Sequence, residues 1–161
     1  MPHENTPTEA EIAYRSKAEQ YCASAEQCRS SVKDKLMTWG AGRDMAQRIV
    51  DSLVEDDFIN EERYCNIYCD SKLRLQKWGR IKIGYQLRNK RIDSKIIDKV
   101  LQNIDPELYS ATLYELAEKK WALLNEPDPN KRTAKLVAFL ASHGFESDEI
   151  QATIKELTQS I

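Results

Sequence analysis

Residues 83–101 read IGYQLRNKRIDSKIIDKVL, and the spacing of the apolar residues in this stretch decides the fold. Ile83 and Leu87 lie four residues apart, as do Ile97 and Leu101, and this is the spacing of one face of an α-helix. Asp93 lies between the two pairs, and aspartate commonly caps a helix N-terminus. The stretch therefore predicts the end of one helix, a short turn and the start of a second helix.

The same pattern occurs three times along the chain of 161 residues. With Leu36, Leu87 and Leu140 as anchors, apolar residues recur four residues before each anchor and five, ten, fourteen and seventeen residues after it. Every one of these positions is apolar, although only 41% of the chain is hydrophobic. A repeat of this period indicates one supersecondary unit that is copied along the chain.

A further helix is predicted at the start of each unit. In the middle unit Tyr64, Tyr68, Ser71, Leu75 and Trp78 follow one another at the spacing of a single helical face. The leading helices of the first and third units are expected over residues 8–23 and 105–124, and the proline-containing segment 125–130 is expected to be a loop.

The fold class that follows is all-α. No proline interrupts residues 8–105, and the chain shows no sustained alternation of apolar and polar residues of the kind that strands require. We expect three tandem three-helix (helix-turn-helix-like) repeats in an elongated, curved array, with the repeats spanning residues 1–57, 58–104 and 105–161. A unit of about 50 residues buries little surface by itself, so neighbouring units are expected to pack together.

Glycine lies at the predicted turn in two of the three units. Gly40 and Gly144 come four residues after the anchor, where a helix that ends in a left-handed residue favours glycine. Arg91 occupies this position in the middle unit. Ser147 is expected to cap the last helix of the third unit, as Asp93 caps that of the second.

The net charge of −2 conceals a strongly uneven distribution. Residues 1–70 carry a net charge of −6, residues 71–100 a net charge of +8, and residues 101–161 a net charge of −4. A basic block of this density is suited to phosphates or to an acidic protein surface, because clustered cations gain most from fixed anions. The alternative interpretation is a solvated helical face that keeps the protein soluble.

The basic residues of the middle segment are therefore the candidate binding residues. Helical geometry predicts that Lys77 and Lys82 are accessible, whereas Arg80 and Lys90 lie nearer the buried stripe. The full candidate set is Lys72, Arg74, Lys77, Arg80, Lys82, Arg88, Lys90, Arg91, Lys95 and Lys99.

The aromatic residues of the middle unit have two interpretations. Tyr64, Tyr68 and Trp78 could stack bases or anchor a partner, but they share the apolar stripe, so core packing is expected for all three. Leu73 points away from that stripe and is expected to contact either a neighbouring repeat or a partner.

Enzyme, metal and membrane signals are missing from the sequence. It has no phosphate-binding glycine loop, no nucleophile elbow and no catalytic constellation, so neither an enzyme nor a cofactor is expected. Cys65 and Cys69 have helical i,i+4 spacing, yet a zinc site requires four ligands, so we expect small packed thiols. The longest apolar run, residues 136–141, is far shorter than the roughly 20 residues of a membrane span, and the N-terminus lacks a secretory signal. A cytoplasmic protein is expected.

Three motifs carry a resemblance to a known family. Residues 57–64 (DFINEERY), 78–83 (WGRIKI) and 86–92 (QLRNKRI) together resemble the regulatory protein RecX family. The resemblance is most specific over residues 30–105 and rests on pattern in the third unit. Arg91 stands where the family usually has glycine, which predicts a turn that is shaped differently or strained.

The resemblance implies an all-α, non-enzymatic modulator of the bacterial recombinase RecA. Such a protein binds the RecA–DNA filament and limits its extension, and thereby reduces strand exchange, ATP hydrolysis and co-protease activity. The expected partners are the RecA filament and single- or double-stranded DNA, with the chain itself a monomer. Lys77, Lys82, Arg88 and Lys90 are the middle-unit cations most expected to touch the filament.

Two other functions compete with this one. A stand-alone helix-turn-helix DNA-binding module predicts salt-dependent binding to naked DNA. A scaffold or oligomerisation protein predicts self-association and indifference to RecA and DNA. Titration against the RecA–DNA filament, bare single-stranded DNA and free RecA separates the three.

Overall fold

The computed structural model describes residues 6–159, and within them the chain is entirely helical apart from its turns and loops. The elements are α1 (Glu9–Ser24), α2 (Arg29–Thr38), α3 (Arg43–Glu55), α4 (Glu61–Ser71), the π-helical turn η1 (Lys72–Gln76), α5 (Arg80–Asn89), α6 (Ser94–Gln102), α7 (Pro106–Leu123), α8 (Pro129–Ser142) and α9 (Ser147–Gln159). The predicted all-α fold is confirmed. None of the described helices is long and apolar enough to cross a membrane.

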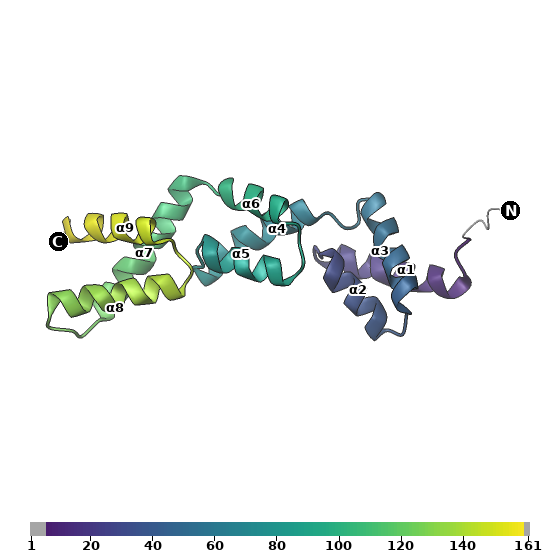
Figure 1. Ribbon diagram of the computed structural model, residues 1–161, viewed down its shortest axis with the longest axis horizontal. Coiled ribbons are helices and arrows are strands. Elements are labelled where there is room, and N and C mark those ends of the chain that lie inside the picture. Colours follow the sequence, from purple (N-terminus) through teal and green to yellow (C-terminus); the bar gives the residue numbers. More distant parts are fainter. Residues whose placement is uncertain (1–5, 160–161) are drawn as a thin grey trace.

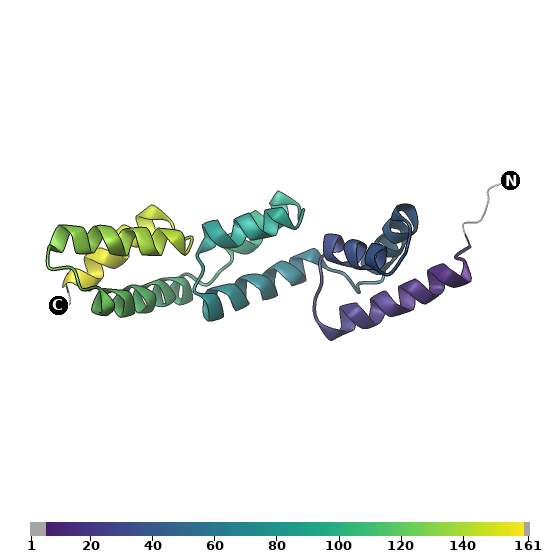
Figure 2. The same cartoon turned by 90° about the horizontal axis from the view of Figure 1, so that it is seen from below.

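The helices form three groups that follow one another along the long axis (Figure 1). We call α1–α3 the first unit, α4–α6 with η1 the second unit, and α7–α9 the third unit. Figure 2 shows the leading helices α1, α4 and α7 along one side of the molecule, with the other two helices of each unit on the opposite side. The result is an elongated array in which each unit touches only its neighbours.

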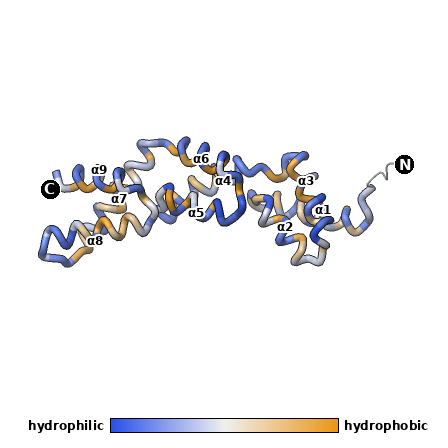
Figure 3. The backbone as a smooth tube through the Cα atoms, viewed as in Figure 1, coloured by the Kyte–Doolittle hydropathy of each residue, from blue (hydrophilic) through white to orange (hydrophobic). Residues whose placement is uncertain are grey.

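The repeating apolar positions build the interior. Among the anchor-based positions only Ile104 is half-buried, and all the others are buried. Figure 3 shows hydrophobic stretches alternating with hydrophilic ones along the helices of all three units. They form two cores. One lies within the first unit and includes Leu36, Ile49 and Leu53, whereas the other runs without interruption through the second and third units. The second and third units therefore share one interior.

The turn between the second and third helix has the same backbone form in all three units. Gly40, Arg91 and Gly144 each have a positive φ, of 110°, 60° and 90° respectively. In each case the amide donates to the carbonyl three residues earlier, at 2.9–3.0 Å. Arg91 thus keeps the shape that the flanking glycines adopt, at a cost of about 1 kcal/mol for a left-handed residue with a side chain.

The leading helix of the second unit differs from its prediction. The α-helix ends at Ser71, the π-helical turn follows, and Lys77 closes it in the left-handed conformation with φ 57°. The wider π-turn rotates the side chains, so Leu73 is 1% exposed and Leu75 is 75% exposed. The predicted helical face is therefore wrong at Leu75, whereas Trp78 packs against the core as predicted. Leu73 makes the contact with a neighbouring unit that was one of its two predicted roles.

The predicted cap at Asp93 is confirmed, whereas the predicted cap at Ser147 is not. The side chains of Asp93, Asp105 and Asp128 accept hydrogen bonds from backbone amides at the starts of α6, α7 and α8. Ser147 is the first helical residue of α9 rather than the residue before it. The predicted loop 125–130 is shorter than expected, because Pro129 already begins α8.

Candidate polyanion-binding surface

Three of the candidate lysines lie against aromatic rings of the second unit. The Nζ atom of Lys72 is 4.9 Å from the ring centre of Trp78 and 5.4 Å from that of Tyr68. Lys82 Nζ lies 4.7 Å from the Trp78 ring, and Lys90 Nζ lies 6.0 Å from the Tyr68 ring. Lys72 lies in η1, Lys82 in α5 and Lys90 directly after α5, and the fold brings the three together around two rings.

Lys77 is held at the boundary between the second and third units. Its carbonyl lies 2.9 Å from His143 Nδ1, and its backbone is left-handed. Lys77 also contributes to lowering the pKa of Glu115 on α7, although the ion pair with Lys119 is the larger cause. The charge of Lys77 therefore acts on the third unit as well as on the second.

Arg80 is occupied within the protein. Its Nη1 donates to Glu146 Oε2 at 2.9 Å, its Nε donates to the Leu101 carbonyl at 3.0 Å, and its guanidinium lies 3.9 Å from the ring centre of Tyr109. The Tyr109 hydroxyl also donates to Glu146, and its burial and this hydrogen bond raise its pKa. This network joins the second unit to the third and leaves Arg80 little freedom to contact a partner.

Replacing Arg80 with methionine is expected to lower the free energy of unfolding by about 2 kcal/mol, because Glu146 and the Leu101 carbonyl lose a donor in a half-buried setting. Arg74→Met is the control, since Arg74 pairs with Asp70 at 2.7 Å on an exposed surface and should cost less than about 0.5 kcal/mol. Chemical denaturation measures both. Equal losses in the two variants would contradict the structural role of Arg80.

The other candidate cations are dispersed. Arg88 lies 3.7 Å from Asp98, and Lys99 lies 2.9 Å from Glu62. Arg91 is exposed at its turn, beside Arg29 and Lys33 of the first unit, and Lys95 is exposed at the start of α6. The remaining candidate, Arg74, is paired with Asp70, so the charge of the block is divided among several faces.

The three aromatic residues predicted to pack in the core do so. Tyr64, Tyr68 and Trp78 are half-buried against the shared core. Tyr85 is 62% exposed, and it shares an outward face of α5 with Ile81, which is 58% exposed. The prediction overlooked Ile81, although its spacing of four residues from Tyr85 was visible in the sequence.

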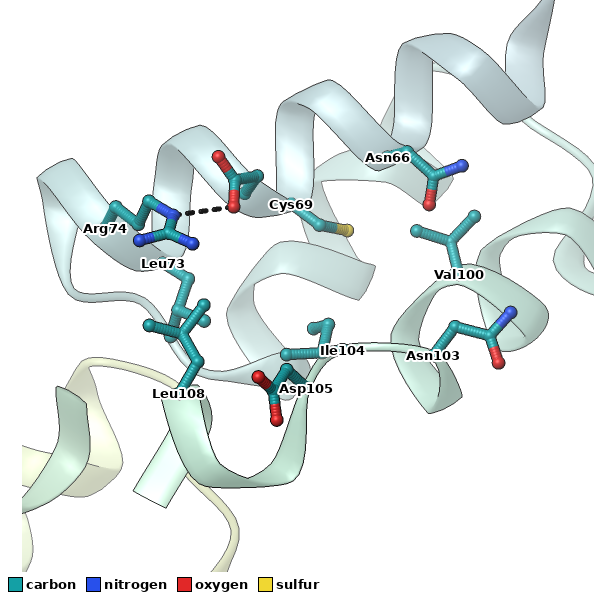
Figure 4. A pocket seen from close by; sticks show the side chains of 10 residues that line it. Asn66, Cys69, Leu73, Arg74, Val100, Asn103, Ile104, Asp105 and Leu108 are labelled. Atoms are coloured by element: carbon teal, nitrogen blue, oxygen red, sulfur yellow. Dashed lines mark hydrogen bonds and ion pairs between the residues drawn. The ribbon is translucent and has the colours of Figure 1, made fainter. Parts of the chain in front are cut away.

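A separate hollow of about 230 Å³ lies where α4 and η1 meet α6 and α7 (Figure 4). Leu73, Val100, Ile104 and Leu108 give it an apolar interior, and the Arg74–Asp70 ion pair closes one side. It carries mixed polarity and no group of unpaired cations. The hollow is therefore distinct from the lysines around Tyr68 and Trp78.

The cysteines are packed thiols. All four are free and buried, and burial raises the pKa of Cys22 to about 11 and the pKa values of Cys65 and Cys69 to about 12. Such thiols remain protonated near neutral pH and react slowly. Within residues 6–159, no group of three or more metal-binding side chains comes together.

The fold and the surface define a class of protein: a tandem three-helix repeat with a cationic middle unit. A family model of the second three-helix domain of RecX matches residues 60–101, and a model of the third three-helix domain matches residues 107–154. The chain belongs to the RecX family of regulatory proteins.

Individual relatives agree with this assignment. Regulatory protein RecX of Clostridium perfringens (strain 13 / Type A) is 36% identical over 131 residues, which are 80% of this chain and 61% of that protein. The chain thus spans about three fifths of the length of this relative. Regulatory protein RecX of Chlorobium phaeobacteroides is 30% identical over 82% of this chain and 87% of that protein.

A solved structure shows the same architecture. The crystal structure of RecX from Lactobacillus salivarius superposes with a TM-score of 0.85 at 25% sequence identity, covering 94% of this chain and 99% of that one. The predicted family resemblance is confirmed.

Proposed function

We propose that this chain is a non-enzymatic, monomeric, cytoplasmic regulator of RecA. In this proposal it binds the RecA–DNA filament and limits filament extension, strand exchange, ATP hydrolysis and co-protease activity. Membership of the RecX family of regulatory proteins is the observation that carries the proposal.

The geometry of the second unit supports this function. Lys72, Lys82 and Lys90 lie on one surface, and none of them has a carboxylate within ion-pair distance among the described residues. Their charges are available to a filament that exposes both phosphates and acidic side chains. The elongated shape lets neighbouring units reach successive subunits of such a filament (Figure 1).

The test is neutralisation of these lysines. The triple variant Lys72→Gln/Lys82→Gln/Lys90→Gln is expected to raise the concentration for half-inhibition of the RecA ATPase about 10- to 30-fold, since each exposed charge contact contributes up to about 1 kcal/mol. The matched control is Arg74→Gln/Lys95→Gln/Lys99→Gln, which removes the same charge from cations of the same unit that lie away from the rings. Wild-type inhibition by the first triple variant would refute the proposed contact, as would an equal loss in the control.

A further inference from the structure

All three units carry the same reciprocal arrangement where their first and second helices meet. In the first unit Lys17 of α1 lies with its Nζ 4.3 Å from the ring centre of Trp39, at the end of α2. Lys35 of α2 lies with its Nζ 5.7 Å from the ring centre of Tyr21 on α1. Each helix thus places a cation over an aromatic ring of the other.

The second unit repeats this arrangement around Tyr68. Lys72, directly after α4, covers Trp78, which precedes α5, and Lys90, at the end of α5, covers Tyr68 of α4. Lys82 adds a second cation over Trp78.

The third unit has the same pairing of its first two helices. Lys120 of α7 lies with its Nζ 4.6 Å from the ring centre of Phe139 on α8. The guanidinium carbon of Arg132 on α8 lies 4.0 Å from the ring centre of Trp121 on α7. Each of the three units therefore pairs cations of one helix with rings of the other, at positions that differ from unit to unit.

Aromatic rings also lie near the two boundaries between units. Tyr64 and Tyr68 have ring centres 5.9 Å apart, and Tyr21 of the first unit adds to the rise that burial causes in the pKa of Tyr64. At the other boundary, the ring of His143, which contacts the Lys77 carbonyl, lies 4.6 Å from Phe139. Each unit thus carries a cluster of cations and rings between its leading helix and its second helix, and these three clusters form a row because the units follow one another along the molecule (Figure 2 shows the helices).

The lysines of this row differ from the ion-paired lysines of the chain. Within residues 6–159, the lysines with a carboxylate inside ion-pair distance are Lys99, Lys119 and Lys135, and none of these covers a ring. The lysines over the rings have no such partner. A ring holds an ammonium group in place without neutralising it, so the positive charge of each of these lysines remains available to an anionic ligand.

The first unit is acidic overall, yet its carboxylates do not neutralise Lys17 and Lys35, the two lysines that lie over its rings. Four of its carboxylates are already bound to arginines: Glu11 to Arg48, Glu19 and Asp56 to Arg15, and Glu26 to Arg63. These carboxylates therefore pair with arginines rather than with Lys17 or Lys35.

We propose that this row binds single-stranded nucleic acid along all three units. We call it the lysine–aromatic seam, and its cations are Lys17, Lys35, Lys72, Lys82, Lys90 and Lys120. This inference rests on the proposed function, which places the chain on a filament that contains DNA. It extends the contact beyond the basic second unit to residues of the two acidic units.

The composition of the seam favours a single strand over a duplex. Unpaired bases can lie against half-buried rings beside each lysine while the phosphates pair with the ammonium groups. A duplex keeps its bases stacked inside and can use the lysines alone. A flexible strand also follows a row that passes from unit to unit, and a linear polyanion matches an elongated row of cations.

The test measures binding to a fluorescent oligothymidylate, long enough to span the three units, by anisotropy at several salt concentrations without RecA. Each lysine–phosphate contact contributes about 0.7 to the slope of log affinity against log salt for a single strand. Lys17→Gln/Lys35→Gln is expected to reduce this slope by about 1.4, and Lys120→Gln by about 0.7. Lys17→Arg/Lys35→Arg should retain the slope of the unaltered chain.

The matched control for the first unit is Lys33→Gln/Arg43→Gln, which removes two charges away from the rings and should leave the slope unchanged. An unchanged slope in Lys17→Gln/Lys35→Gln, or an equal reduction in the control, would refute the proposal that the seam binds the strand. Tighter binding to a duplex of the same length would overturn the choice of ligand. If the chain binds no single strand but inhibits RecA normally, the seam is refuted and the proposed function stands.

Discussion

Replacing Gly144 with alanine is expected to lower the free energy of unfolding by about 3 kcal/mol. Gly144 has φ 90°, a conformation that costs an L-residue about 1 kcal/mol or more. A Cβ atom at this position would also lie 2.6 Å from the backbone N of Lys82 and overlap its side chain. Because the obstruction is backbone from the neighbouring unit, relief requires the second and third units to separate.

The Gly144 carbonyl makes this separation costly. It accepts a hydrogen bond from the Ile81 amide at 3.0 Å, and the adjacent His143 carbonyl accepts one from the Gly79 amide at 2.8 Å. Movement that accommodates the new methyl group therefore stretches both bonds at the start of α5.

Chemical denaturation of Gly144→Ala beside Gly42→Ala measures the effect. Gly42 has no neighbouring atom within 4 Å of an added Cβ and no positive φ, so its replacement should cost less than about 1 kcal/mol. Similar stabilities of the two variants would show that the second and third units do not pack as closely at Gly144 and Lys82 as the structure indicates.

Replacing Leu73 with alanine is the second change with a large expected effect. Leu73 is 1% exposed and belongs to the core that the second and third units share. Removing its side chain leaves a cavity next to the hollow lined by Val100 and Leu108, and such losses cost about 3 kcal/mol. The shared core should make both units lose stability together.

Leu75→Ala is the control for this change, since Leu75 lies two residues away in the same π-turn and is 75% exposed. Its replacement is expected to alter the free energy of unfolding by less than about 0.5 kcal/mol. Thermal or denaturant unfolding distinguishes the two variants. A greater loss from Leu75→Ala would mean that the α-helical stripe predicted from the sequence, rather than the rotated one, exists in solution.

The contrast between these leucines shows where sequence reasoning works for this chain. The anchor spacing around Leu36, Leu87 and Leu140 predicted 17 of the 29 buried hydrophobic residues in the described part of the chain, because a buried helical face repeats every three to four residues regardless of its partners. The π-turn could not be predicted in this way. It depends on how η1 packs against the third unit, and nothing within the local sequence Lys72–Gln76 breaks the α-helical period.

The candidate site was predictable in composition but not in arrangement. Counting charges identified the basic second unit, yet Arg80 lies within a network to Glu146 and Tyr109 that joins residues far apart in the chain. The seam lysines Lys17 and Lys120 belong to units that are acidic overall, so a regional charge count overlooks them. Their pairing with rings appears only when two helices are placed side by side.

The division of the interior into two cores determines which units can change their orientation relative to one another. The second and third units share buried side chains and backbone hydrogen bonds, whereas the first unit reaches the second through Cys28, through ion pairs such as Arg63–Glu26, and through the hydrogen bond from Ser30 to the Lys90 carbonyl. A ligand that binds the second unit therefore also fixes the position of the third unit, because the two move as one rigid body. The first unit has a separate core and must be oriented by its own contacts with the ligand. It is therefore the part of the molecule best able to adjust to the helical pitch of a filament to which the second and third units are bound.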